Sequence, residues 1–125
     1  TYLPDGRHFT LNLSMGVNET GASENACWLD DRIVYLPPVM FIRQELDASA
    51  QNTWRVYHQN LGWSKVNIDL TFTPITAYKK TDNFGVLASI FEQWLGLYSG
   101  EIRLGDEVIK IDKVMGLAED HFAKW

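Results

Sequence analysis

The sequence predicts an antiparallel, all-β domain, and three observations support this prediction. Apolar and polar residues alternate over several short segments, which is the period of a strand with one buried face. Two β-rich segments near the C-terminus flank a short loop that contains glycine, as in a β-hairpin. Turn-forming residues interrupt the chain at short intervals, which is typical of sandwiches and barrels. Both a barrel and a strongly curved sheet fit this pattern.

The expected strands can be placed in chain order. Residues 9–14 and 65–72 alternate apolar with polar side chains, and residues 54–58 continue the same pattern. Another strand is expected to begin at Glu24-Asn25 and to include Cys27, which fits the role of a small buried residue. The expected breaks between strands are Asp30-Asp31, Pro37-Pro38, Asn60-Leu61-Gly62, Pro74 and Asp82-Asn83.

The later segments are less uniform. In residues 84–95 the apolar side chains follow a helical spacing, which alone favours a helix. Gly85, Gly96 and the β-rich surroundings favour a strand, and we predict a strand. Residues 101–104 and 108–111 flank Gly105-Asp106-Glu107 as a hairpin. Residues 44–51 form a second candidate helix of about one turn, so at most one or two short helices are expected.

Composition narrows the class of protein. The chain has 125 residues, enough for one domain with one core, and 46% of them are hydrophobic. Aromatic residues make up 13%, and such residues favour strands and line apolar cavities. The formal net charge is −5 without a basic run, so neither a nucleic-acid partner nor a basic membrane-binding segment is expected. No run approaches the 18 apolar residues that would indicate a membrane span.

Cysteine and histidine usage gives further expectations. Cys27 is the only cysteine, and the three histidines lie far apart in the sequence, so neither a disulfide within the chain nor a metal site is expected. No phosphate-binding loop is present, and we expect no cofactor. A reducing cytoplasm is the simplest expected location. The chain begins at Thr1 without a signal peptide, which suggests a fragment or a processed product.

Several segments in order along the chain resemble an uncharacterised family, domain of unknown function 2804. The matching segments are residues 6–13, 24–30, 68–74, 91–96, 98–100 and 116–121, with the final Trp125. One departure is Trp94, where the resemblance implies proline or a smaller residue. The family is similar to lipocalin-like (calycin) barrels, and more distantly to carotenoid hydratase-like and tocopherol cyclase-like proteins, which hold apolar substrates. The resemblance implies a single lipocalin-like domain over residues 1–125, the C-terminal portion of a longer protein. It also makes residues 84–95 a strand.

Two groups of polar residues are candidates for chemistry. Glu24, at the expected mouth of the fold, can serve as a general acid, with Asn25 orienting a ligand beside Trp28. The alternative is an ion pair from Glu24 to Arg7 or Arg103, with Asn25 satisfying turn backbone groups. Glu119 and His121 share one face of a strand and form the second group, although a polar run near a terminus is often solvated surface.

Aromatic residues complete the expected ligand site. Trp94 and Tyr98 are candidates for ligand contacts, and each also fits a role in the core. The other aromatic residues considered for a pocket are Trp28, Trp54, Trp63, Trp125 and Tyr57.

Three functions fit the sequence, and whether the domain is an enzyme stays open. The first is binding of a small apolar molecule, such as a lipid or isoprenoid-like ligand. The second is a cofactor-free hydratase, cyclase or isomerase that uses Glu24 or Glu119 as its acid. The third is a structural half that packs on an N-terminal portion of the same protein, or forms a homodimer, through an exposed apolar patch.

Overall fold

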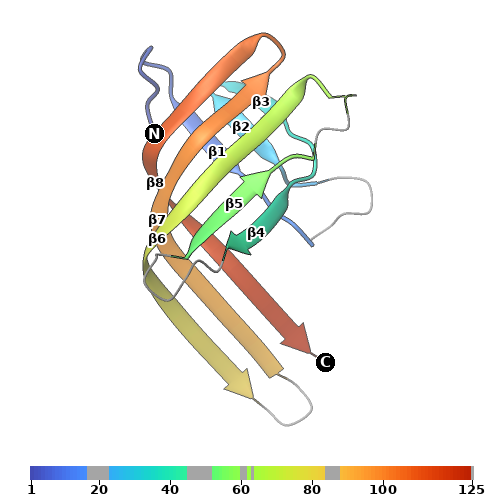
Figure 1. Cartoon of the computed structure of the whole chain (residues 1–125), viewed down its shortest axis with the longest axis vertical. Coiled ribbons are helices and arrows are strands. Elements are labelled where there is room, and N and C mark those ends of the chain that lie inside the picture. Colours follow the sequence, from blue (N-terminus) through green and yellow to red (C-terminus); the bar gives the residue numbers. More distant parts are fainter. Residues whose placement is uncertain (17–22, 45–51, 60–61, 63, 84–87, 125) are drawn as a thin grey trace.

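Eight antiparallel strands make up the regular structure of this computed structural model, which describes residues 1–16, 23–44, 52–59, 62, 64–83 and 88–124 (Figure 1). Trp63, Trp125, residues 45–51 of the candidate helix and residues 84–87 lie outside the described residues. Among the described residues no helix has the length and apolar character needed to cross a membrane. The strands are β1 (Phe9–Asn12), β2 (Ala26–Leu29), β3 (Arg32–Tyr35), β4 (Met40–Gln44), β5 (Thr53–Tyr57), β6 (Val66–Asn83), β7 (Ala88–Leu104) and β8 (Glu107–Lys124).

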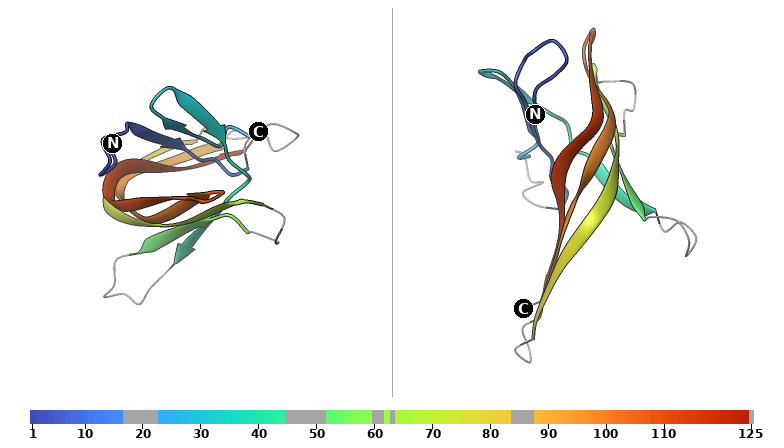
Figure 2. Two further views of the ribbon diagram at one scale, coloured as in Figure 1. Left: turned by 90° about the horizontal axis from the view of Figure 1, so that it is seen from above. Right: turned by 90° about the vertical axis from the view of Figure 1, so that its left-hand side faces the viewer.

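The strands form two sheets, each in the order of the chain. One sheet contains β1-β2-β3 and the other contains β4-β5-β6-β7-β8. The five-stranded sheet curls strongly, and the three-stranded sheet lies across its concave side (Figure 2). The predicted all-β antiparallel class is therefore confirmed in its curved-sheet form, since the described strands do not pair into a closed barrel.

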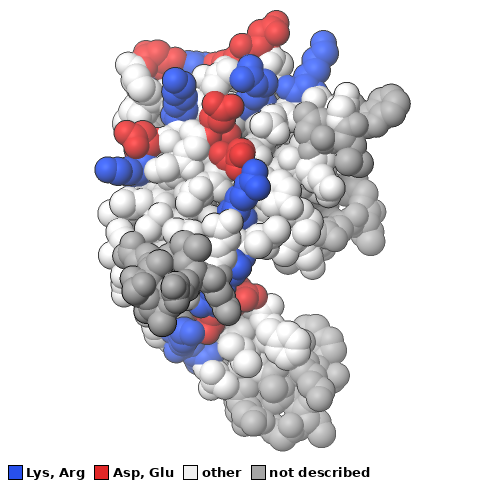
Figure 3. Space-filling model, viewed as in Figure 1, with Lys and Arg blue, Asp and Glu red and all other residues white. Residues whose placement is uncertain are grey.

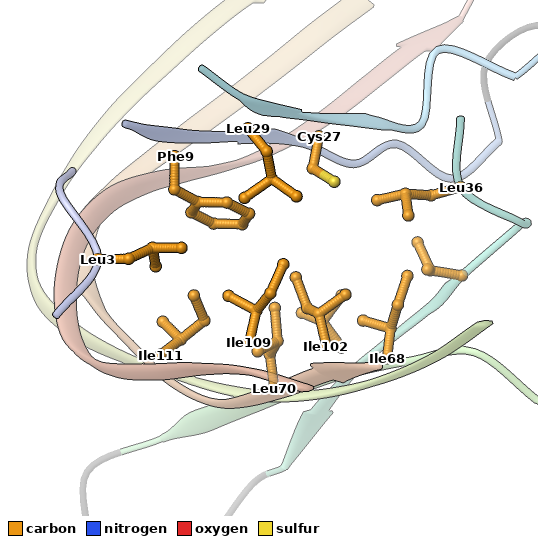
Figure 4. Close-up of a cluster of buried hydrophobic side chains, with 12 residues drawn as sticks. Leu3, Phe9, Cys27, Leu29, Leu36, Ile68, Leu70, Ile102, Ile109 and Ile111 are labelled. Carbon is orange, nitrogen blue, oxygen red and sulfur yellow. The ribbon is translucent and has the colours of Figure 1, made fainter. Parts of the chain in front are cut away.

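The core lies between the two sheets. Six buried residues come from the segment before β4 and six from β5 to β8, and their side chains meet face to face (Figure 4). They are Leu3, Phe9, Cys27, Leu29, Leu36 and Val39 on one side, and Val56, Ile68, Leu70, Ile102, Ile109 and Ile111 on the other. Each such side chain contributes about 1.5–3 kcal/mol when it leaves water. Cys27 is fully buried, as predicted.

The hairpins confirm several predicted turns. Leu104 pairs with Glu107, so the last loop contains Gly105 and Asp106 only, and Glu107 already belongs to β8. Gly105 has a φ of 65°, which suits the first position of a type II′ turn. Residues 88–95 lie in β7, which confirms the strand prediction for that part of residues 84–95.

The predicted break at Pro74 is wrong, because β6 continues through it to Asn83. The pairing of β6 with β7 shifts between Pro74 and Thr76, where Ile75 is an extra residue. A bulge tolerates the missing N–H of proline, which a regular ladder does not. The predicted break at Asp82-Asn83 also falls within a strand, because these are the last two residues of β6.

A line of small or irregular residues crosses the three long strands where they bend. Pro74 pairs with Gly96, and Gly96 pairs with Gly116. A Cβ atom at Gly96 would lie 2.5 Å from the ring of Phe72, and one at Gly116 would lie 2.9 Å from the ring of Tyr98. Aromatic rings therefore occupy the space that side chains would fill at the two glycines. Beyond this line β6, β7 and β8 extend away from the three-stranded sheet (Figure 1).

Candidate functional site

A groove of about 930 Å³ lies between the concave side of the five-stranded sheet and β1 with the residues that follow it. Phe9, Leu11 and Leu13 form one wall, and Ile111 and Val114 of β8 face them. The other side of the groove carries Phe41, Arg43 and Trp54 from β4 and β5. Ligand sites of small molecules are commonly concave and about 300–1,000 Å³ in volume, so this groove has the size of such a site, with a lining that mixes apolar and polar residues.

Four of the seven predicted site residues line this groove. They are Glu24, Tyr98, Glu119 and His121. Gln93 of β7 lies opposite Glu119 of β8, and Phe91 lies opposite His121, so alternation places Glu119 and His121 on the face of β8 opposite to the buried Ala118. The carboxylates of Glu24 and Glu119 belong to exposed residues at the rim of the groove.

The other three predicted residues lie outside the groove lining. Asn25 is 1% exposed; its Oδ1 accepts a hydrogen bond from the Ser14 N–H at 2.6 Å, and its Nδ2 donates to the Pro37 carbonyl at 3.1 Å. Asn25 thus joins the chain after β1 to the chain after β3. Alternation in β2 places Trp28 on the opposite face from the buried Cys27.

Trp94 lies beneath the groove. It is 5% exposed, and its ring lies 4.9 Å from that of Trp54 in an edge-to-face arrangement. Phe72 also packs edge-to-face on Trp54, with ring centroids 6.3 Å apart, and Tyr98 contacts Phe72 at 4.7 Å. Such aromatic pairs add about 0.5–1.5 kcal/mol beyond their buried area. The cluster forms a firm apolar support for Trp54, which faces the groove.

Tyr98 is fixed by both ends of its side chain. Its ring packs over Gly116, and its hydroxyl donates a hydrogen bond to the Leu117 carbonyl at 2.9 Å. Burial raises the pKa of Tyr98 to about 12, because the phenolate would lose its hydration. Tyr98 therefore offers a ligand its ring surface, while its neutral hydroxyl already donates its proton to the Leu117 carbonyl.

Glu119 and His121 each have a partner on β7. Gln93 Nε2 donates to Glu119 Oε1 at 2.5 Å, and His121 Nε2 lies 3.0 Å from Ser89 Oγ. Within the described residues the His121 ring contacts Ser89 and, edge-on, Phe91. A serine nucleophile also needs a group that orients the imidazole and donors for an oxyanion. The Ser89–His121 pair alone does not supply them.

Arg7 and Arg103, the two expected ion-pair partners of Glu24, contact other carboxylates. Arg7 contacts Asp5 and Glu107, and Arg103 contacts Glu101. The hydrogen bonds from Asp5 and Glu107 raise the pKa of Arg7, and the Arg7 guanidinium lowers the pKa of Asp5. Because Glu107 begins β8, these contacts connect the N-terminal segment to the five-stranded sheet.

The charges that accompany Trp54 and Trp94 at one end of the groove were absent from the expected site. Arg43 lies with its Cζ 5.7 Å from the Trp54 ring and 5.1 Å from the Trp94 ring. Glu92 lies 3.7 Å from Arg43 and 2.5 Å from the Lys79 ammonium. Lys79 and Glu92 are cross-strand partners at equal distances from residues 84–87 in the sequence. Treating residues 76–95 as a hairpin would have predicted this pair.

Charge elsewhere is mixed. On the face of the five-stranded sheet turned away from the core, basic and acidic side chains alternate in small groups (Figure 3). Arg55 and Asp69 form one such pair, with two hydrogen bonds of 3.0 Å. In the described part of the chain no group of three or more His, Cys, Asp or Glu residues has the arrangement to hold a metal ion.

Comparison with known proteins gives one result. A family model described as "Domain of unknown function (DUF2804)" matches residues 1–125. No curated protein and no solved structure matches the chain.

Proposed function

Because the chain belongs to the DUF2804 family, whose description names no activity, we propose a function from the geometry of the groove: binding of a small, largely apolar molecule. The observation that carries this proposal is a groove of about 930 Å³ with Trp54 and Tyr98 on one side and Phe9 and Leu11 on the other. Burying an apolar ligand there gains about 25 cal/mol for each Å² removed from water.

The lipocalin-like resemblance of the sequence supports the same class of ligand. Lipocalin-like barrels hold apolar molecules between facing β surfaces, and carotenoid hydratase-like and tocopherol cyclase-like proteins act on isoprenoid substrates. A lipid or isoprenoid-like molecule is therefore the ligand class we propose. This part of the argument is an analogy of fold and assigns no reaction.

Acid catalysis receives less support from the site. A general acid works best where water is excluded from the reacting groups. Glu24 and Glu119 are both exposed, and Glu119 already accepts a hydrogen bond from Gln93. Binding thus accounts for the geometry better than a cofactor-free hydratase, cyclase or isomerase does.

An interface role is the second candidate, favoured by exposed apolar side chains on the extended half of β6 and β8. Tyr78, Met115 and Leu117 share one face of the sheet by register and are between 54% and 64% exposed. Exposed apolar residues that gather in one region often mark a surface that another protein covers. An N-terminal portion of the same protein or a second copy would fit this role. Sedimentation of the isolated chain tests it, and a monomer at all concentrations would count against the second copy.

Ligand titration tests the binding proposal. We expect retinol, a neutral apolar probe, to quench tryptophan fluorescence in a saturable way. Val114→Trp fills the groove and should abolish this binding, whereas Val108→Trp, on the same strand but outside the groove lining, should leave it unchanged. Circular dichroism confirms that both variants fold. Absence of saturable binding by retinol and by long-chain alcohols, acids and amines would refute the proposed function.

A further inference from the structure

We propose that the ligand is an amphiphile with a single carboxylate, and that the guanidinium of Arg43 binds this carboxylate while the apolar chain lies along the groove. The inference rests on the proposed function, because it assigns the chemistry of the head group at the same site. Arg43 is the one Lys or Arg side chain among the described residues that line the groove.

The position of Arg43 is fixed by its strand and by two indole rings. It pairs in register with Trp54, so both side chains lie on the concave face of the sheet. Its guanidinium lies over the rings of Trp54 and Trp94, at 5.7 and 5.1 Å from their centroids. Guanidinium groups stack well on aromatic faces, and stacking limits their motion without using their N–H donors.

Among the described residues, the ion pairs around Glu92 leave the Arg43 donors largely unused. Glu92 Oε1 lies 2.5 Å from the Lys79 ammonium, a short charge-assisted contact. Glu92 Oε2 lies 3.7 Å from Arg43 Nη1, beyond hydrogen-bond distance. A guanidinium has five N–H donors, and the side chain of Arg43 is 39% exposed. Arg43 is therefore a positioned cation that can still bind an anion in two parallel hydrogen bonds.

The charges on the groove also decide the direction of the ligand. Glu119 lies on β8 and Glu24 lies just before β2, so an anion is repelled from that side. The carboxylate is thus directed to the β4 side, where Arg43 lies. The apolar chain then contacts Leu11, Leu13 and Val114, which are only partly buried and carry no charge.

A carboxylate fits this position better than a phosphate. The planar fork of a guanidinium matches the two oxygens of a carboxylate. A phosphate monoester carries close to two negative charges, and Glu92 lies 3.7 Å from the Arg43 guanidinium, where it would repel the second charge.

Three ligands of equal chain length test the head group: dodecanoate, dodecanol and dodecylamine, titrated calorimetrically below their aggregation limits. We expect the wild type to bind dodecanoate about tenfold or more tightly than dodecanol, as hydrogen bonds to a charged group provide. Arg43→Gln should reduce dodecanoate affinity to that of dodecanol and leave dodecanol affinity within about twofold. Arg43→Lys should retain part of the preference for dodecanoate, because lysine keeps the positive charge but lacks the planar pair of N–H donors that a guanidinium offers to a carboxylate.

Arg55→Gln is the matched control, because Arg55 lies next to Trp54 on the opposite face of β5 and pairs with Asp69. An equal loss of dodecanoate affinity in this variant would overturn the inference in favour of a general charge effect. Equal binding of dodecanoate and dodecanol by the wild type would overturn it while the proposed function stands. Tighter binding of dodecylamine would overturn it too, placing the head group near Glu24 and Glu119. Failure of all three ligands would overturn the inference if retinol still binds, and would refute the proposed function itself if retinol fails as well.

Discussion

Replacing Gly96 by alanine tests the bend of the long strands most directly. The new Cβ would lie 2.4 Å from the Thr73 carbonyl oxygen and 2.5 Å from Phe72 Cζ. Ordinary contacts of a Cβ begin at about 3.4 Å, so the atom is about 1 Å too close to both neighbours. The carbonyl belongs to the paired strand β6 and cannot rotate away as a flexible side chain would.

The cost follows from what has to move. Overpacking a well-packed site commonly costs about 1–3 kcal/mol, and here a backbone ladder must open as well. We expect Gly96→Ala to lower the free energy of unfolding by about 3 kcal/mol or more, a large part of the 5–15 kcal/mol typical of a domain. Urea unfolding followed by tryptophan fluorescence measures this loss, and Trp94 lies two residues from the substitution.

Gly105→Ala is the control for the effect of adding a methyl group. Gly105 has a φ of 65°, and a Cβ there would meet nothing within 4 Å. Only backbone strain of about 1–2 kcal/mol is expected. A loss for Gly96→Ala below about 1 kcal/mol, or one no larger than that for Gly105→Ala, would contradict the proposed close packing of β6 and β7.

Two further predictions concern Asn25 and Tyr98. Asn25→Ala should lower the free energy of unfolding by about 2–4 kcal/mol, because the Ser14 N–H and the Pro37 carbonyl lose their hydrogen-bond partner. The control is Asn12→Ala at an exposed position, which should lower it by less than about 1 kcal/mol. Urea unfolding measures both changes. The pKa of Tyr98 is about 12, so below pH 10 this residue is neutral in both states and its contribution does not change with pH. Between pH 10 and about 12 the unfolded chain ionises first, and the free energy of unfolding should fall by up to about 2.7 kcal/mol. Tyr98→Phe should lack this fall, and a wild-type titration at 295 nm in which all tyrosines ionise near pH 10 would refute it.

The sequence predicted the fold best where one face of a strand is buried. Residues 65–72 alternate because Ile68, Leu70 and Phe72 all face the core. β3 and β4 were not predicted, since Ile33, Tyr35, Met40 and Ile42 are exposed apolar residues that obscure the alternation. The bulge at Pro74 was missed because a proline usually ends a strand, and only the neighbouring strand shows that it does not.

The site was predictable only in part, because it depends on register. Glu119 and His121 could be placed on one face by alternation within a single strand. The cluster around Arg43 also contains Trp54, Lys79, Glu92 and Trp94, so its residues come from β4, β5, β6 and β7. A pattern within one segment does not show which residues of four strands lie opposite each other. Trp94 was a candidate from the sequence, and its position under Arg43 follows from the pairing of β4 with β5 and of β6 with β7.

The order of the strands in each sheet has a consequence for how quickly the chain folds. Every described pairing joins strands that follow each other in the sequence, so each forms by closing a hairpin. A hairpin can form from its turn outward, so no pairing has to join segments that are separated by another strand, as in a Greek-key sandwich. The two sheets then meet through side chains alone, with no strand exchanged between them. Docking of the three-stranded sheet is therefore expected to be the slow step, and the one that completes the groove.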